Sequence, residues 1–136
     1  MLICVELSVD LRVAETEVRW PRFSGQGWLA LPPLQAAYKH VQMLIEFRPE
    51  SWHGILFLTG ERDDLAGDFI AILLNQGFIE LRFDCGSGVG VVRSDETVKL
   101  NQWNKLTVYR HRWNAWIQFN NGKHIQGRSK VSLFII

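Results

Sequence analysis

The feature that most restricts the fold of this chain is a two-residue alternation of apolar and polar side chains. In residues 40–49, HVQMLIEFRP, one face of an extended chain carries Val41, Met43, Ile45 and Phe47. Residues 77–84, GFIELRFD, and residues 114–123, NAWIQFNNGK, show the same alternation. Because successive side chains of a β-strand point to opposite faces, this pattern predicts strands with one buried and one polar face.

Turn-forming residues separate the alternating segments at short intervals, in residues 24–27, 32–33, 75–77, 86–90 and 120–122. Residues 68–74, DFIAILL, are apolar on both faces after the first aspartate, which predicts a central strand covered on both sides. Many short strands joined by turns are typical of an antiparallel sandwich. We therefore predict an all-β fold, an antiparallel jelly-roll β-sandwich.

Length and composition are those of one globular domain. The chain has 136 residues, of which 47% are hydrophobic and 21% charged. Its apolar runs are far shorter than the ~20 residues that a membrane helix needs, so we expect no membrane span. Residues 1–15, MLICVELSVDLRVAE, lack a basic first segment and are interrupted by Glu6, so we do not expect a signal peptide.

Charge is distributed unevenly along the chain. Residues 1–92 carry 7 Lys or Arg and 12 Asp or Glu, whereas residues 93–136 carry 8 and 2. A basic second half can attract an anionic polymer. The alternative is that interleaved surface charges only keep the strands soluble.

The residue types of an active site are present, but their spacing does not fit catalysis. Glu80 and Asp84 alternate on one strand, where four residues separate the two carboxyl groups by roughly 13 Å. Glycosidases need about 5 to 9.5 Å between their two carboxyl groups. Arg82 also lies between them, so we predict cross-strand charge partners on a solvated face.

Other catalytic and metal motifs are missing from the sequence. The four histidines show no metal-ligand spacing, and the two cysteines, Cys4 and Cys85, cannot form a structural zinc site alone. The glycines of residues 85–90, CGSGVG, precede a strand-like segment and not a helix, which excludes a dinucleotide-binding loop. Cys85 follows a predicted strand, where a small half-buried residue fits. Whether Cys4 and Cys85 form a bridge is left open.

Six tryptophans are many for this length and have two interpretations. Trp103 lies between strand-like segments and is predicted to fill the core. Trp113 and Trp116 lie near a turn beside Arg110 and Arg112, so we expect them to be partly exposed. An aromatic ring beside a guanidinium indicates either cation–π packing or contact with a glycan.

An acidic loop precedes the strand at residues 69–74. Residues 60–68, GERDDLAGD, supply Glu61, Asp63, Asp64 and Asp68 within eight positions. Carboxylates and backbone carbonyls are the ligands of hard cations such as Ca²⁺. On the chemistry alone, such a loop is more often a solvated acidic turn.

Five segments together resemble the laminin G-like domain family: FSGQGWLALPP, IEFRPESWHGILFLTG, GDFIAILLNQGFIELRFDCGSGVGVVRS, VKLNQWNKLTVYRHR and IQFNNGKHIQG. The resemblance covers roughly residues 18–130. It implies a concanavalin-like jelly roll over residues 18–136, preceded by an extension over residues 1–17. It also implies a secreted, extracellular-matrix setting within a larger multidomain protein, and calcium-assisted binding of acidic glycans such as those of dystroglycan or heparan sulfate.

The resemblance also assigns part of a calcium site. The aspartate that opens the DF strand in this family is a calcium ligand, and the matching residue is Asp68. A backbone carbonyl at the end of the next strand is a second ligand, and the matching residue is Cys85. The family's remaining ligands follow a later strand, where this chain reads GRSKVSLFII. We therefore expect an incomplete site, missing last strands and exposed strand edges.

We predict a non-enzymatic binding module that uses calcium and recognises acidic glycans or glycosylated matrix and cell-surface proteins, with no nucleic-acid partner. Charge-assisted contacts to sulfate or uronic acid are assigned to Arg93, Arg110, Arg112, Lys123, Arg128 and Lys130. The alternative is a protein-interaction module that pairs a partner strand with its open edge, without calcium. Salt separates the two, because glycan binding weakens with ionic strength and edge pairing does not.

Overall fold

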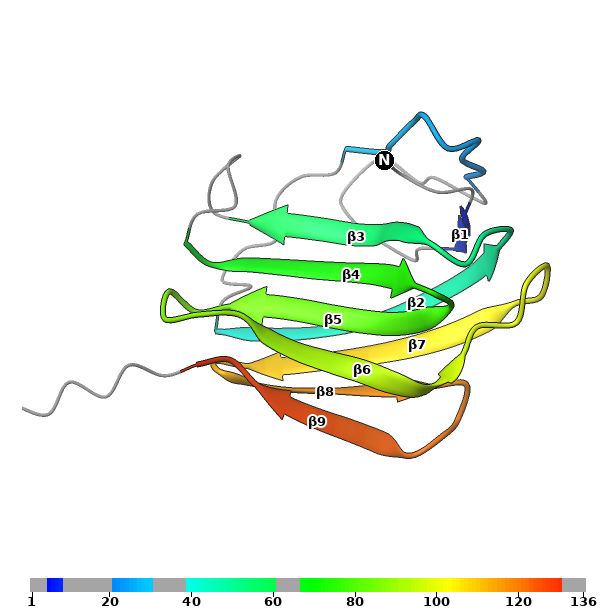
Figure 1. Cartoon of the computed structure of the whole chain (residues 1–136). Coiled ribbons are helices and arrows are strands. Elements are labelled where there is room, and N and C mark those ends of the chain that lie inside the picture. Colours follow the sequence, from blue (N-terminus) through cyan, green and yellow to red (C-terminus); the bar gives the residue numbers. More distant parts are fainter. Residues whose placement is uncertain (1–4, 9–20, 31–38, 61–66, 131–136) are drawn as a thin grey trace, which may run out of the picture.

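The structure is a computed structural model that describes residues 5–8, 21–30, 39–60 and 67–130. These residues form strands and no helix (Figure 1). The strands are β1 (Val5–Ser8), β2 (His40–Pro49), β3 (Gly54–Gly60), β4 (Phe69–Asn75), β5 (Phe78–Asp84), β6 (Gly90–Thr97), β7 (Asn104–His111), β8 (Asn114–Phe119) and β9 (His124–Arg128). Within the described ranges, no helix is long and apolar enough to cross a bilayer.

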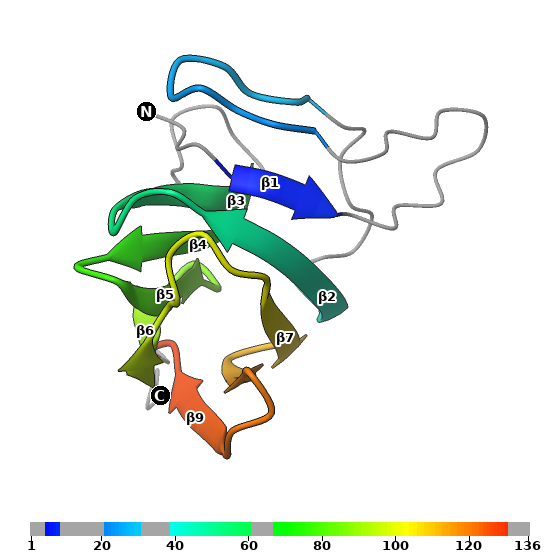
Figure 2. The ribbon, with the colours of Figure 1, turned by 90° about the vertical axis from the view of Figure 1, so that its right-hand side faces the viewer.

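The strands form two antiparallel sheets that face each other (Figure 2). One sheet has five strands in the order β1-β2-β7-β8-β9, and the other has four in the order β3-β4-β5-β6. The edge strands β6 and β9 lie side by side, so the two sheets meet along that edge. This arrangement confirms the predicted all-β sandwich.

The predicted buried faces form the core between the sheets. In the five-stranded sheet, Ile45 pairs with Leu106 and Val108 pairs with Ile117, and all four are buried. The alternating apolar side chains of β4 and β5 enter from the other sheet. They are Ile70, Ile72, Leu74, Ile79, Leu81 and Phe83. The two-residue alternation therefore assigned these inward faces correctly.

A tight hairpin joins β4 to β5 and fixes their register. Gln76 and Gly77 both have positive φ, 52° and 83°, as a two-residue hairpin turn requires. A Cβ at Gly77 would come within 2.6 Å of the Trp52 ring, so the ring packs directly on this glycine. The resulting register places Phe69 opposite Asp84 at the far end of the two strands.

The polar face of β5 differs from the prediction, because Glu80 is only 5% exposed. Its Oε1 accepts a hydrogen bond from Asn75 Nδ2 at 3.0 Å, and its Oε2 accepts two from Arg82, at 3.0 and 2.6 Å. Burial by itself raises the pKa of this carboxyl. The hydrogen bonds from Arg82 and Asn75 and the charges of Arg82 and Arg93 outweigh burial and lower the pKa. Arg93 lies directly across from Glu80, as expected of cross-strand charge partners.

The prediction that Trp103 fills the core is wrong, because Trp103 is 46% exposed. Asn104 enters the interior instead, followed by Leu106 and Val108. Its side chain accepts a hydrogen bond from Lys99 N at 3.0 Å and donates to Lys99 O at 2.9 Å. Trp103 lies at an outward-facing position of this alternation, so its exposure could have been predicted from the sequence.

Candidate functional site

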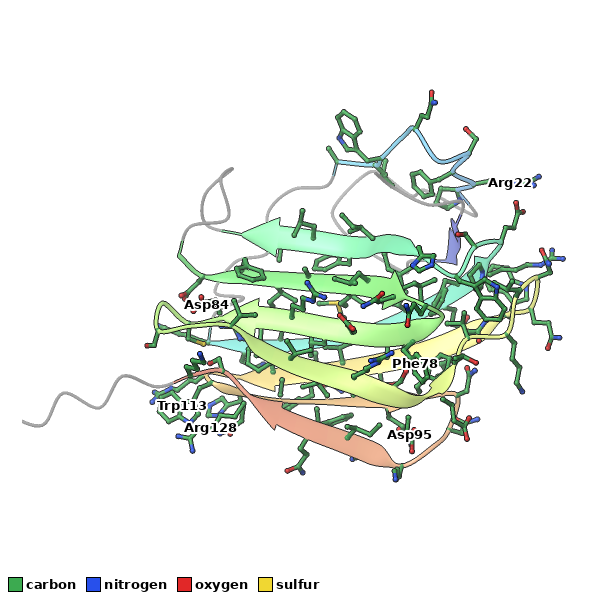
Figure 3. The ribbon with its side chains drawn as sticks, viewed as in Figure 1. Arg22, Phe78, Asp84, Asp95, Trp113 and Arg128 are labelled. Carbon is green, nitrogen blue, oxygen red and sulfur yellow. The ribbon has the colours of Figure 1, made fainter. Side chains whose placement is uncertain are left out.

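One end of the sandwich brings together most of the predicted site residues. We call it the Asp84 rim and define it as Asp68, Asp84 to Gly88, Arg112, Trp113 and residues 128–130. Figure 3 shows Asp84, Trp113 and Arg128 gathered at this end, and Phe78 and Asp95 at the other. Backbone hydrogen bonds join the parts: Ser129 N donates to Trp113 O at 2.9 Å, and Lys130 N donates to Gly88 O at 3.2 Å. The turn after β5, the turn between β7 and β8 and the end of β9 therefore form one surface.

The turn after β5 is shaped by the Asp84 carboxylate. Its Oδ1 accepts hydrogen bonds from Gly86 N at 2.7 Å and from Gly88 N at 3.0 Å. Gly86 and Gly88 have φ of 89° and 129°, which side chains rarely adopt. The glycines that the sequence placed here are thus required by the backbone, and one carboxylate oxygen holds the loop.

Asp68 lies beside this turn. It is half-buried and precedes Phe69, the residue that pairs with Asp84, so the next position across the ladder is Cys85. Asp68 Oδ1 is 3.8 Å from the position that a Cβ on Gly86 would occupy. The structure therefore brings the two residues assigned to calcium, Asp68 and Cys85, to neighbouring positions.

The described residues supply only part of a calcium donor set. Among them, no group of three or more His, Cys, Asp or Glu is arranged to hold a metal. Calcium takes six to eight oxygen ligands. Glu61, Asp63 and Asp64 of the acidic loop, and residues 131–136, lie outside the described residues. One carboxylate next to a backbone carbonyl fits the cation in ligand type, and the calcium assignment stays a prediction.

Arg110 is not available to a ligand, which corrects the expectation that it contacts a glycan. It is 1% exposed. Its Nε donates to Arg112 O and its Nη2 donates to Asp84 O, both at 3.0 Å. The same Nη2 lies 2.7 Å from Cys85 Sγ, and its guanidinium lies over the Phe83 ring at 5.5 Å. Arg110 therefore ties the turn after β5 to the turn between β7 and β8 from inside.

Cys85 takes part in the same buried network. Its thiol is free and half-buried, and Sγ donates to Arg112 O at 3.1 Å. This agrees with the prediction of a small, half-buried residue at a strand end. Cys4 lies outside the described residues.

Two of the predicted ligand-binding cations are placed away from the Asp84 rim. The Arg93 guanidinium lies 4.2 Å from the centre of the Phe78 ring. Lys123 Nζ forms an ion pair with Asp95 at 3.1 Å. Both neighbours, Phe78 and Asp95, lie at the other end of the sandwich (Figure 3). The structure does not join these two cations to the rest.

The other three cations meet at the rim around one indole. Arg112 and Arg128 place their guanidinium carbons 5.9 and 5.7 Å from the centre of the Trp113 ring. The Lys130 stem lies against Gly88, where a Cβ would approach Lys130 Cδ to 2.9 Å. All three cations are exposed, and within the described part of the chain none forms an ion pair with a carboxylate.

Trp116, the other tryptophan considered for glycan contact, belongs to a different feature. It lies in a row of rings that crosses the five-stranded sheet. Its ring stacks on Tyr109 of β7 at 5.4 Å and on His124 of β9 at 4.2 Å. Because neighbours from both adjacent strands stack on it, Trp116 serves cross-strand packing.

Comparison with known proteins identifies the family. A family model described as the laminin G domain matches residues 47–133, more than half of the chain. Pikachurin of Bos taurus is 34% identical over 113 residues, which is 83% of this chain and 11% of that protein. The basement membrane-specific heparan sulfate proteoglycan core protein of Mus musculus is 30% identical over 109 residues, which is 79% of this chain and 3% of that protein.

Solved structures agree on the fold. Domains LG4-5 of the mouse laminin alpha1 chain match with a TM-score of 0.63 at 18% identity, covering 74% of this chain and 27% of that chain. The LG1-3 region of the laminin alpha2 chain matches with a TM-score of 0.64 at 18% identity, covering 98% of this chain and 23% of that chain. The alternating strands, the two-layered sandwich and these matches together lead to one conclusion: the chain belongs to the laminin G domain family.

Proposed function

We propose that this chain is a non-enzymatic extracellular-matrix binding module that recognises acidic glycans or glycoproteins at the Asp84 rim, with calcium assisting. The observation that carries the proposal is the convergence there of Asp68, the Cys85 backbone and three exposed cations. Family membership supports a binding role, since the relatives include a proteoglycan core protein named for the basement membrane. The same relatives support an extracellular location within a longer protein, because the chain spans 11% or less of each.

Asp68 and the Cys85 carbonyl are the proposed calcium groups. Both are oxygen donors on adjacent strand ends, the type of ligand that calcium prefers. A bound calcium ion supplies positive charge that attracts a carboxylate or sulfate group of a glycan. Further oxygen ligands are needed to complete the site, so the affinity of these groups for calcium is expected to be modest.

The proposed glycan contacts are Arg112, Arg128 and Lys130. Guanidinium groups bind carboxylate and sulfate groups through paired, charge-assisted hydrogen bonds. Arg110 is removed from the predicted set because it is buried. Arg93 and Lys123 are removed because they lie away from the rim and have other partners.

The edge-pairing alternative is disfavoured where β6 meets β9. A Cβ at Gly90 would approach Ser129 N to 2.6 Å, so the backbones of the two edges already touch. A partner strand at that edge has to displace this contact before it can pair.

Thermal unfolding in excess calcium and in excess chelator tests the calcium part. A ligand that binds only the folded chain stabilises it by RT ln(1 + [L]/Kd), about 2.7 kcal/mol at a hundredfold excess over Kd. We expect a calcium-dependent rise in melting temperature that disappears in Asp68→Ala and persists in the control Asp95→Ala, an exposed carboxylate at the other end. An equal rise in Asp68→Ala and wild type contradicts the assignment.

A further inference from the structure

We propose that His40 and His111, the histidine pair, bind a divalent transition metal ion such as Zn²⁺ on the solvent-facing side of the five-stranded sheet. The inference goes beyond the proposed function, because it concerns other residues, other donor atoms and another class of metal ion. Calcium takes oxygen ligands, whereas imidazole nitrogens suit zinc, copper and nickel. The two histidines are far apart in sequence, so the pairing of β2 with β7 is what brings them together.

The first argument is the strand register. His40 begins β2 and His111 ends β7, and the two residues lie directly opposite each other. Arg112 N donates to Lys39 O at 2.9 Å, so the neighbouring residue pair is a hydrogen-bonded one. Because hydrogen-bonded and non-hydrogen-bonded pairs alternate along an antiparallel ladder, the histidine pair is non-hydrogen-bonded. Such pairs bring their side chains close together, with Cβ atoms roughly 4.5–5.5 Å apart.

The second argument is that both imidazoles lie on the same open face. The neighbours Val41 and Arg110 are buried in the core, so the alternation points the two histidine side chains to solvent, and both are exposed. Two nitrogen ligands about 2.0–2.1 Å from one Zn²⁺ ion lie roughly 3.3 Å from each other in a tetrahedral site. Imidazoles on directly opposed residues can reach this separation by rotating about their side-chain bonds, while the backbone stays in place.

The third argument is that packing restrains one ligand before the metal arrives. The His40 ring meets the Tyr109 ring edge-to-face at 5.2 Å, and Tyr109 in turn stacks on Trp116 at 5.4 Å. The backbone beneath the pair belongs to the continuous ladder that joins β2 to β7. Both restraints reduce the entropy that is lost when the metal binds.

The histidine pair supplies two ligands, and water has to supply the others. No group of three or more His, Cys, Asp or Glu is arranged for a metal among the residues that the structure describes. The residue opposite His111 on β8 is Asn114, a neutral amide. Lys39 and Arg112 adjoin the pair, and their positive charges oppose a bound cation. We therefore expect an affinity well below that of a structural zinc site with four protein ligands.

Nuclear magnetic resonance of the isotope-labelled 136-residue chain, free of any histidine tag, tests the proposal in a titration with zinc chloride. We expect the imidazole resonances of His40 and His111 to shift together along one saturation curve, while those of His53 and His124 stay in place. Calcium chloride at the same concentrations should leave all four imidazoles unchanged, because calcium takes oxygen ligands.

Calorimetry gives the matching test of affinity. His40→Ala and His111→Ala should each weaken zinc binding by at least about tenfold, because the remaining imidazole loses its chelating partner. The matched control is His124→Ala, which removes an exposed histidine from the same sheet. His124 lies opposite Gln118 and not opposite a histidine, so its loss should change zinc affinity less than about twofold. Circular dichroism in chelator checks that each variant folds, and either pair variant alone decides the outcome.

Three results overturn the inference. They are equal zinc shifts of all four imidazoles, no zinc shift at the histidine pair, and a zinc affinity that falls in Cys85→Ser but not in His111→Ala. Asp68→Ala keeps this inference separate from the proposed function. It should leave the zinc affinity unchanged, because the histidine pair contains no carboxylate, and a loss equal to that of His111→Ala would assign the zinc to the Asp84 rim instead.

Discussion

Replacing Arg110 tests whether a buried guanidinium holds the Asp84 rim together. Arg110 is 1% exposed, and it donates to the carbonyls of Arg112 and Asp84 at 3.0 Å each. In Arg110→Leu both carbonyls lose this donor inside the protein. Arg112 O still accepts from Cys85 Sγ at 3.1 Å, so the full cost applies to Asp84 O alone. A buried acceptor that loses its donor costs about 1–3 kcal/mol. Relief from burying a charge offsets part of this, so we expect a net loss of about 1–2 kcal/mol in unfolding free energy.

The assay is urea unfolding followed by tryptophan fluorescence and circular dichroism. Arg112→Leu is the matched control because Arg112 is exposed, and its unfolding free energy should change by no more than about 0.5 kcal/mol. Arg110→Lys keeps the charge but lacks the planar fork that reaches both carbonyls, so an intermediate loss is expected.

A second readout follows the rim itself. Because Arg110 joins the turn after β5 to the turn carrying Trp113, Arg110→Leu should also weaken heparin binding while every exposed cation remains. An unfolding free energy for Arg110→Leu within about 0.5 kcal/mol of wild type would refute the reasoning, since the two carbonyls would then not depend on this donor.

Three further predictions concern the rest of the sandwich. Glu80 has a lowered pKa in the folded state. The carboxylate therefore stabilises the fold at pH values above its ordinary pKa of 4.5, and this stabilisation is lost as the pH falls through the lowered pKa. Between neutral and acidic pH, Glu80→Gln should lose less stability than wild type, and parallel curves of stability against pH would contradict this. Gly77→Ala places a Cβ within 2.6 Å of the Trp52 ring at a φ of +83° and should cost about 2 kcal/mol, whereas Gly27→Ala, which meets nothing within 4 Å, should cost little in the same urea assay. Ser129 Oγ is buried without a hydrogen-bond partner among the described residues, so Ser129→Ala should not destabilise the chain. Ser94→Ala should cost about 1–3 kcal/mol, because Ser94 Oγ accepts from Ile79 N at 2.9 Å and donates to Glu96 O at 2.7 Å. Equal melting temperatures for the two variants would contradict this prediction.

The sequence by itself determined the central strands, their inward faces and the sandwich, whereas the pairing of β1, within the predicted extension, with β2 came only from the structure. Alternation is a local property, and the apolar faces of β2, β5 and β8 have one way to avoid water, against a second sheet. It also placed Asp68 beside Cys85, because the hairpin at Asn75 to Phe78 fixes the register of β4 and β5. The same alternation could have predicted the exposure of Trp103 and the burial of Arg110. Leu106, Val108 and Arg110 are two residues apart and therefore point to the same, inward face, whereas Trp103 points outward.

Only the tertiary structure decided which cations form a surface. Arg112 and Arg128 are sixteen positions apart in sequence, and they meet at Trp113 because β9 pairs with β8 and brings Arg128 opposite Asn114. Lys130 reaches Gly88 only because the edge strands of the two sheets pack together. The sequence around a long charged side chain does not indicate which residues that side chain will contact. Whether a charge is buried, paired or free for a ligand is set by sheet pairing and by packing between sheets, and both join distant parts of the chain.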